Sequence, residues 1–447
     1  MPRYLPYVWL VLSVSALAII SRLEGAQILH RLGELEPTVA VLASFALIGL
    51  CSFISFYATQ GTPIPSFVVA IALGIAGHEL FAPVAANPVI LTSLVTGGAA
   101  IVLFAGGLEM PPLGSFMQLF NKVVLLAIPG VLLTGLGLSF VVAGVSQVLG
   151  FAISPAVAIL LGAILASTDP AAIIPALQNI RFLRRNAKDI VIAESAVSDV
   201  TGSLLTLTFL RLPLTGLSVF AAYKALATAE IARYFGVQVL FGVLSAVAAY
   251  LLLRLLSRIK RNHPEAYGAD LLYFLGSPFI AFASAAVFGG SGFLAVFLAG
   301  LIFHAEEHMR AIEHLFNQVV DGVAKPIIFL LVGALVNINA LIAYAPVGIA
   351  VALIFMFVLR PVMVFSMLGL YSLFPNSPRA LSVRELLFIS FVRETGAIPA
   401  VLLVTAVSEM STPVDGLVEI GMWVILLTLI LAPPLTPYVA RRLGVAE

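Results

Sequence analysis

Charged residues are scarce in this chain of 447 residues. Asp, Glu, Lys and Arg make up only 10% of it, and hydrophobic residues make up 61%. Because a soluble domain carries about 25% charged residues, this composition excludes a water-soluble globular protein and indicates a polytopic membrane protein. The net charge of +1 is too small to indicate binding to nucleic acid, and we expect none.

Cysteine is almost absent as well. Cys51 is the single one, so no intrachain disulfide can form, and its place in an apolar run favours a buried structural thiol. The glycine cluster "GGSG" at 289 to 292 stands alone and is better explained as a tight connection between helices than as a phosphate-binding loop. We therefore expect no cofactor.

Long hydrophobic runs are what the sequence has in abundance. A spanning helix needs about 20 mostly apolar residues, and fourteen segments are candidates. Their approximate bounds are 5 to 20, 38 to 58, 65 to 82, 89 to 110, 122 to 149, 155 to 179, 190 to 211, 228 to 256, 270 to 288, 291 to 304, 320 to 337, 345 to 371, 385 to 408 and 418 to 440. The sequence thus predicts an all-α membrane protein with about 13 to 14 transmembrane helices.

The segments form one unit. We expect an N-terminal helix and loop at 1 to 37, a single transmembrane domain at 38 to 440 and a short tail at 441 to 447. The first run could be a signal peptide, but Arg3 is the single basic residue before it and no clear cleavage site follows. We therefore favour a retained helix.

Basic residues indicate the orientation, because cytoplasmic loops collect Lys and Arg. Alternate loops carry them, and the intervening loops are poorer, apart from Arg22, Arg31 and Lys224. The basic loops contain Lys122; Arg181, Arg184, Arg185 and Lys188; Arg254, Arg258, Lys260 and Arg261; Arg310; Arg379 and Arg384; and Arg441 and Arg442. The alternation predicts a cytoplasmic C-terminus and, with fourteen spans, a cytoplasmic N-terminus.

Several hydrophobic segments contain residues that break helices, and two of these breaks are informative. "LASTDPAAIIPAL" places Thr168, Asp169, Pro170 and Pro175 within 155 to 179, and Pro170 removes a backbone donor and disfavours helix at the residue before it. "FVRETGAIPAVLL" interrupts 385 to 408 in the same way. Unpaired backbone at membrane depth is tolerated where it lines a cavity, so two broken helices in the two halves of the chain indicate a transporter with repeats and a midplane site. That the repeats are inverted is a further inference.

Two acids lie inside another apolar segment, in "AESAVSDVTG" at 193 to 202. At about 100° per residue, Glu194 and Ser198 share one stripe of the helix, and Ser195 and Asp199 share another. For Glu194, a structural role in a buried ion pair explains the sequence as well as a role in ion binding does. For Asp199 and Asp169 a structural role is a poor explanation, because two acids on neighbouring spans repel unless a cation or a proton lies between them.

The basic partner of one acid is expected to be Arg360, the basic residue well inside the span 345 to 371. Paired with Glu194 it forms a fixed, net-neutral strut, since arginine does not release its proton, and Asp199 is left to exchange ions. Arg393 is a second candidate and could instead pair locally with Glu394. We expect Lys325, at the end of its span, to extend to the membrane interface.

Several short motifs resemble one family when they are taken together. These are "GGLEM" at 106 to 110, "STDPAA" at 167 to 172, "ESAVSD" at 194 to 199, "SGFLAVFLAGLIF" at 291 to 303, "LRP" at 359 to 361 and "RETGAIPAVLL" at 393 to 403. From about residue 38 to 440 the chain resembles the monovalent cation:proton antiporters, in particular bacterial Na+/H+ and K+/H+ exchangers of the NhaP type. The resemblance implies two crossing broken helices in inverted repeats, a dimer, and an elevator-like movement of a six-helix core.

The resemblance also assigns roles to residues. It implies that Asp199 binds the ion, that Thr168 and Asp169 contribute from the crossing helix, that Ser195 adds a hydroxyl ligand, and that Arg360 clamps Glu194. It places the core in helices about 89 to 211 and 320 to 408 and the dimerisation helices around 38 to 82 and 228 to 304.

Ser198 departs from the family pattern, which has Asn or Asp before the main aspartate. Serine is neutral like Asn but reaches less far and has one donor instead of two, so the preference among Na+, Li+ and K+ stays open. Arg360, where the electrogenic branch has a lysine, favours electroneutral exchange. The short tail suggests a bacterial protein of the inner membrane. We expect this protein to bind no metal other than the transported cation.

A proton and a dehydrated alkali cation are expected to compete for Asp199, which couples opposite gradients without ATP. A cation channel is the alternative, but no string of filter carbonyls such as T-V-G-Y-G is present. An intramembrane aspartyl protease is disfavoured because its Gly-x-Gly-Asp signature is missing, so we expect a transporter and not an enzyme. "HAEEH" at 304 to 308 matches an inverted zinc-protease pattern, yet a solvated face explains it better, with pH sensing as a weaker hypothesis.

Overall fold

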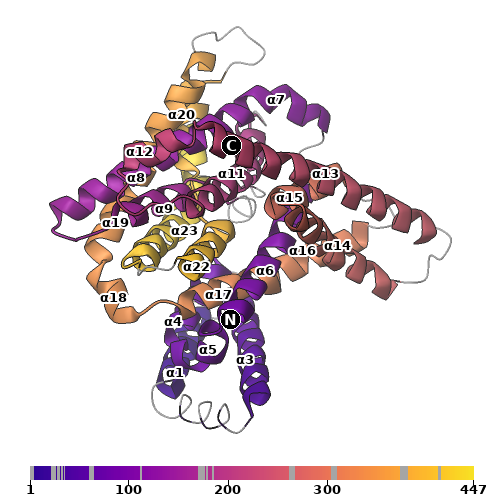
Figure 1. Ribbon diagram of the computed structural model, residues 1–447, viewed down its shortest axis with the longest axis vertical. Helices are drawn as coiled ribbons and strands as arrows, with labels where there is room; N and C mark the ends of the chain where they lie inside the picture. The colour runs from indigo at the N-terminus through magenta and orange to yellow at the C-terminus, as the bar shows by residue number, and fades with distance from the viewer. Residues whose placement is uncertain are drawn as a thin grey trace.

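The structure is a computed structural model. It describes residues 5–21, 27, 31, 34, 36–59, 65–110, 113–169, 177, 180–183, 186–260, 267–303, 310–372, 381–410 and 414–447. Within these ranges the chain is helical, and its single β-bridge joins Phe182 to Ala446. The prediction of an all-α membrane protein is confirmed (Figure 1).

The helices follow the predicted hydrophobic segments. They are α1 (Leu5–Ile20), α3 (Pro37–Thr59), α4 (Ser66–Ala76), α5 (His78–Ala85), α6 (Pro88–Leu108), α7 (Leu113–Leu125), η2 (Leu126–Gly130), α8 (Val131–Val148), α9 (Pro155–Leu165), α11 (Asn186–Leu210), α12 (Val219–Ala225), α13 (Ala229–Lys260), α14 (Tyr267–Val287), α15 (Gly292–Ile302), α16 (Arg310–Val319), η4 (Val320–Ala324), α17 (Lys325–Ala334), α18 (Ile338–Ala343), α19 (Ala345–Ile354), η5 (Phe355–Leu359), α20 (Arg360–Leu368), η6 (Gly369–Ser372), α21 (Val383–Phe391), α22 (Ala397–Glu409) and α23 (Leu417–Arg442).

The described parts of the predicted spans differ in length. Within the described residues, eight helices are long and apolar enough to cross a membrane, and the pair α4 and α5 makes a ninth, although it is bent by 91°. Five further apolar helices have only 10–17 residues in the described ranges. Together these fourteen elements lie on the fourteen predicted segments, but the sequence did not indicate the sharp bend at Gly77 between α4 and α5.

Three π-helical turns occur beside prolines. Pro129 lies inside η2, Pro326 follows η4 and Pro361 follows η5 by two residues. Proline lacks an N–H and clashes with the carbonyl four residues earlier, and a wider turn relieves both problems. Two of these turns end directly at the buried basic residues Lys325 and Arg360.

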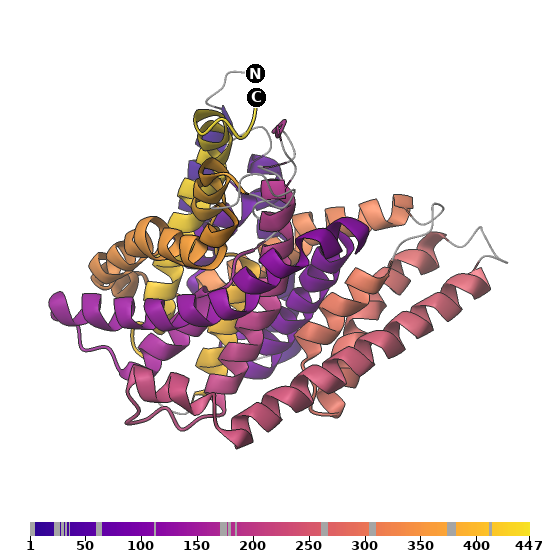
Figure 2. The ribbon, with the colours of Figure 1, turned by 90° about the horizontal axis from the view of Figure 1, so that it is seen from above.

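The helices form a body with two projecting groups. In Figure 1, α1, α3, α4 and α5 gather at the bottom, and α13 and α14 extend to the right. In Figure 2 the paired helices α13 and α14 lie along one edge, where they contact each other and α15. Between the two groups, α6 contacts α15, α17 and α22, so it joins both to the centre.

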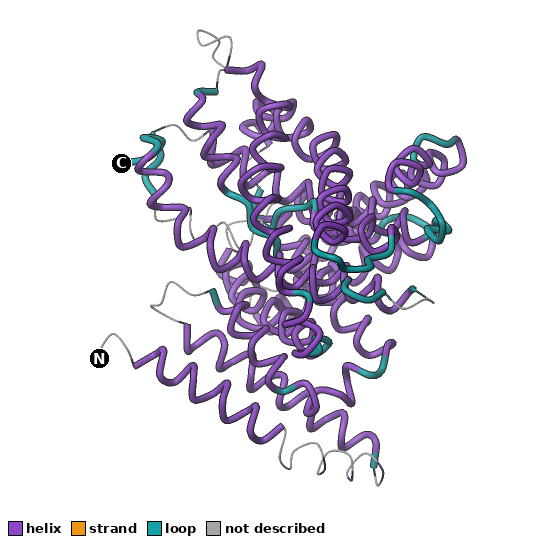
Figure 3. Tube along the Cα trace, turned by 90° about the vertical axis from the view of Figure 1, so that its left-hand side faces the viewer, coloured by secondary structure: helices purple, strands orange, loops and turns teal. Residues whose placement is uncertain are grey.

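The two predicted helix breaks lie inside the body. After α9 the residues 166–169 are not helical, and between α21 and α22 the residues 392–396 are extended or irregular. Figure 3 shows such short non-helical segments among the central helices. Ser154 caps α9 by accepting from the N–H of Val157, with Pro155 at the first helical position. Pro170 and Pro175, part of the first predicted break, lie outside the described residues.

Candidate functional site

Helix α11 carries four of the predicted binding residues. Glu194, Ser195, Ser198 and Asp199 are each at most 1% exposed, although the surrounding sequence is apolar. The helix contacts α9, α7 and α22, so it is enclosed by protein where these polar side chains occur. Polar groups at this depth require polar partners or an ion, because no lipid atom can satisfy them.

Ser198 joins α11 to the break after α9. Its Oγ accepts a hydrogen bond from the backbone N–H of Thr168 at 3.1 Å and lies 2.9 Å from the Thr168 hydroxyl. It also donates to the carbonyl of Ser195 at 2.9 Å. A small hydroxyl at this position thus replaces a backbone partner that Thr168 loses where the helix ends.

Asp169 joins the first break to the second. Its backbone N–H donates to the carbonyl of Glu394 at 3.0 Å, and its Oδ2 accepts from the N–H of Ala397, the first residue of α22, at 2.6 Å. The carboxylate therefore lies at the positive end of the α22 dipole. Gly396 permits this approach, because a Cβ there would lie 1.8 Å from Oδ2.

Arg393 makes the complementary contact. Its Nη2 donates to the carbonyls of Leu165 at 2.8 Å and Ala166 at 2.6 Å, and its guanidinium carbon lies 4.6 Å from the ring centre of Phe355. A cation therefore lies at the negative end of the α9 dipole. Arg393 was considered as a second partner for an acid or as a local partner of Glu394, but the hydrogen bonds of its side chain go to these carbonyls. Both oxygens of Glu394 are buried and have no hydrogen-bond partner among the described residues.

Glu194 and Arg360 form a buried ion pair. Nη1 of Arg360 donates to Oε1 at 3.2 Å and Nη2 donates to Oε2 at 3.0 Å, so the contact is bidentate. Side-chain exposure is 3% for the arginine and 1% for the glutamate. The π-turn η5 precedes Arg360 directly.

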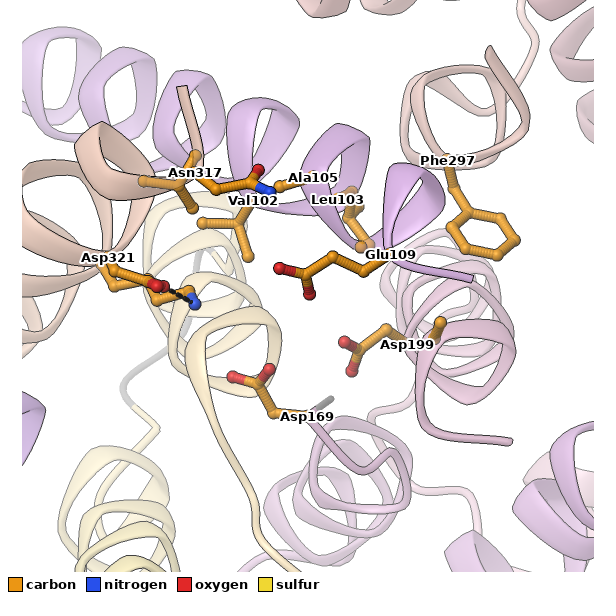
Figure 4. A pocket seen from close by; sticks show the side chains of 13 residues that line it. Val102, Leu103, Ala105, Glu109, Asp169, Asp199, Phe297, Asn317 and Asp321 are labelled. Carbon is orange, nitrogen blue, oxygen red and sulfur yellow. Dashed lines mark hydrogen bonds and ion pairs between the residues drawn. The ribbon is translucent and has the colours of Figure 1, made fainter. Parts of the chain in front are cut away.

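A small cavity lies beside the two breaks. Asp169 and Asp199 both line it, together with Glu109 and residues of α6 and α15 (Figure 4). Its free volume is about 10 Å³, roughly what one water molecule occupies. Oδ1 of Asp199 is buried and has no hydrogen-bond partner among the described residues. The residues that line the cavity do not include Thr168, Glu194, Ser195 or Ser198.

Four further polar residues line the cavity, and none of them was predicted as a site residue. Glu109 comes from the end of α6, and Asn317, Asp321 and Lys325 lie at four-residue intervals along α16, η4 and α17. The prediction that Lys325 extends to the membrane interface is wrong, since the residue is 7% exposed and its Nζ is paired with Asp321. Glu109 is the one acid at the end of an otherwise apolar run, and that isolation was the signal for it.

The described residues were also compared with the pattern of a resident metal site. No three His, Cys, Asp or Glu side chains there are grouped so that they could hold a resident metal ion. The "HAEEH" segment at 304 to 308 lies outside the described residues.

Sequence comparison gives the family. Residues 42–442 match the family described as sodium/hydrogen exchanger, transmembrane. The K(+)/H(+) antiporter NhaP of Alkalimonas amylolytica is 29% identical over 378 residues, which are 81% of this chain and 60% of that protein. The "Probable Na(+)/H(+) antiporter 2" of Methanocaldococcus jannaschii is 27% identical over 325 residues, 70% of this chain and 71% of that protein. This chain thus spans about 60% of the length of the NhaP relative.

Structural comparison gives the same fold. The sodium proton antiporter MjNhaP1 of Methanocaldococcus jannaschii aligns with a TM-score of 0.69 at 24% identity, over 88% of this chain and 99% of that one. Because the family match extends over nearly the whole transmembrane region, this chain belongs to the sodium/hydrogen exchanger family.

Proposed function

We propose that this chain is a secondary antiporter that exchanges a monovalent cation for protons across a membrane. The observation that carries the proposal is the cavity in which the carboxylates of Asp169 and Asp199, from two different segments, meet beside two crossing helix breaks. Hard oxygen ligands suit an alkali cation. The small volume favours a dehydrated ion over a hydrated one.

Competition at Asp199 provides the coupling. A proton and a cation each neutralise the same carboxylate, so the site binds one or the other. Asp169 remains at the N-terminus of α22 and contributes negative charge from the crossing segment. Thr168, Ser195 and Ser198 place backbone and hydroxyl oxygens just behind the carboxylates and complete the site when the breaks shift.

The exchange is electroneutral in this proposal. Arg360 is held by both oxygens of Glu194, and this pair carries no net charge through the cycle. One carboxylate then exchanges one proton for one cation. Na+, Li+ and K+ all fit this scheme; the NhaP relative is named for K+ and MjNhaP1 for sodium.

The movement is proposed to be an elevator within a homodimer in a bacterial inner membrane, with the C-terminus in the cytoplasm. The core comprises helices at about 89 to 211 and 320 to 408, and dimer contacts involve helices around 38 to 82 and 228 to 304. The outward side of α13 supports this division, because only 28% of its most apolar stretch is buried and it exposes Leu240, Leu244, Val247 and Leu251.

The test is a flux measurement on purified protein in liposomes. The internal pH is followed after a pulse of external Na+, Li+ or K+, with the membrane potential clamped by valinomycin and K+ or left free. Cation-dependent proton movement that is the same under both conditions supports one-for-one exchange. Movement that follows the potential overturns electroneutrality, and current without proton movement identifies a channel instead.

A further inference from the structure

Lys325 places a fixed positive charge inside a cavity that is otherwise acidic. Among the described lining residues, four carboxylates face the cavity, those of Glu109, Asp169, Asp199 and Asp321. Figure 4 shows three of them, Glu109, Asp169 and Asp199, pointing toward one space, with the Lys325–Asp321 contact beside it. A transported cation that enters this space meets an ammonium that is already there.

The burial of the pair is unequal. The Lys325 side chain is 9% exposed, whereas that of Asp321 is 53% exposed. Asp321 therefore lies on the open side and draws the ammonium away from the inner acids. An ammonium on a flexible four-carbon stem can change partners within a cavity more easily than a guanidinium in a bidentate pair.

The helix that carries these residues determines where the lysine side chain begins. Asn317, Asp321 and Lys325 occur at four-residue intervals, so they lie along one face of the continuous span Ile312–Ala334. The π-turn η4 ends directly before Lys325, and Pro326 follows it. The lysine thus lies where α17 meets α6, the helix whose end carries Glu109.

We propose that Lys325 is a tethered competitor of the transported cation, and that Asp321 sets the strength of this competition by holding the ammonium aside. Lys325 then determines the apparent cation affinity without belonging to the binding site itself. The inference rests on the proposed exchange function, because it concerns the cation that binds at Asp169 and Asp199.

The proposal predicts opposite effects from the two partners. Lys325→Gln removes the competitor and lowers the cation concentration for half-maximal exchange about fivefold or more, the lower end of couplings between two ligands of one protein. Asp321→Asn releases the ammonium toward the inner carboxylates and raises that concentration by a similar factor. The double variant behaves like Lys325→Gln, since Asp321 then has no ammonium to hold. Lys325→Arg keeps the charge, but a guanidinium pairs more firmly with Asp321, so its half-maximal concentration lies between those of Lys325→Gln and the wild type.

A structural ion pair gives another pattern. If the pair only stabilised the helix, both single substitutions would lower activity or stability in the same direction, and that result overturns the proposal. Lys224→Gln is the control for a change of one charge, because Lys224 is exposed on α12; it should leave the half-maximal concentration unchanged.

Two readouts separate this inference from the exchange function. The first is proton flux in liposomes against cation concentration, and the second is the Na+ or K+ concentration that half-maximally raises the thermal unfolding midpoint in detergent. Absence of exchange in the wild type overturns the proposed function. If the wild type exchanges ions and Lys325→Gln has the wild-type cation affinity by both readouts, only the role of Lys325 is overturned.

Discussion

Removing one member of the Glu194–Arg360 pair should destabilise the protein strongly, whereas removing both should not. Both side chains are almost fully buried and share two hydrogen bonds of 3.0 and 3.2 Å. Nε of Arg360 has no hydrogen-bond partner among the described residues. Glu194→Gln or Arg360→Met therefore leaves one buried charge uncompensated, which costs about 3–5 kcal/mol.

The double variant tests the reasoning. Glu194→Gln with Arg360→Met removes both charges, and such replacements are often neutral or stabilising by about 1–4 kcal/mol. The unfolding free energies of the wild type, both single variants and the double variant, measured in mixed micelles of increasing dodecyl sulfate fraction, form a double-mutant cycle. We expect a coupling energy of several kcal/mol and a double variant near the wild type. Additive losses would refute a coupled buried pair.

The same double variant separates a strut from a transport residue. If the pair carries no charge through the cycle, the folded double variant still exchanges cations for protons in liposomes, and the flux remains independent of membrane potential. A folded double variant without exchange, or with exchange that follows the potential, would show that one member of the pair takes part in ion movement.

Three further predictions concern the breaks and the cavity. Asp199→Asn should reduce cation-dependent proton flux to that of empty liposomes with an unfolding midpoint near the wild type, and appreciable flux would contradict its assignment. Asp169→Ala removes the acceptor of the Ala397 N–H and should cost about 1–2 kcal/mol in micelle unfolding, whereas Asp169→Asn keeps the cap and should cost clearly less; equal losses would contradict a capping role. Gly396→Ala forces a Cβ against Asp169 and should lower the unfolding free energy by about 1–3 kcal/mol. The control Gly144→Ala, whose Cβ meets no atom within 4 Å, should be neutral or stabilise α8 by about 0.5–1 kcal/mol. An unchanged stability in Gly396→Ala would refute the close approach.

The positions of the helices could be predicted from the sequence because hydrophobic length is a local property. Each of the fourteen elements in the described residues lies on a predicted run. The breaks were also visible in the sequence. Pro170 and Pro399 lie in apolar runs that also contain charged residues, Asp169 in the first run and Arg393 and Glu394 in the second. Arg360 could be predicted to face an acid because it is the basic residue deep within its run, and the structure brings it to Glu194.

The remaining features depend on tertiary packing. The bend at Gly77 was not predicted, because a glycine in a long apolar run is also compatible with a continuous helix. The location of Lys325 could not be predicted for a related reason. A lysine near the end of a run ordinarily extends to the interface, and only the π-turn η4 and the packing of α17 on α6 direct it to the cavity. Glu109 is visible in the sequence as an isolated acid, but its place in the cavity depends on which helix ends beside Asp199.

The two carboxylates at the centre of the site differ in how firmly they are held, and this difference supports a division of roles. Asp169 accepts from the first N–H of α22 while Arg393 donates to the last carbonyls of α9, so each half-helix end meets the opposite charge. A proton on Asp169 would weaken a contact that joins both breaks. Oδ1 of Asp199 has no partner among the described residues, so a proton or a cation can occupy it without breaking a hydrogen bond that holds the crossing. This difference supports the proposal that Asp199 exchanges ions, whereas Asp169 keeps the crossing intact and adds negative charge beside it.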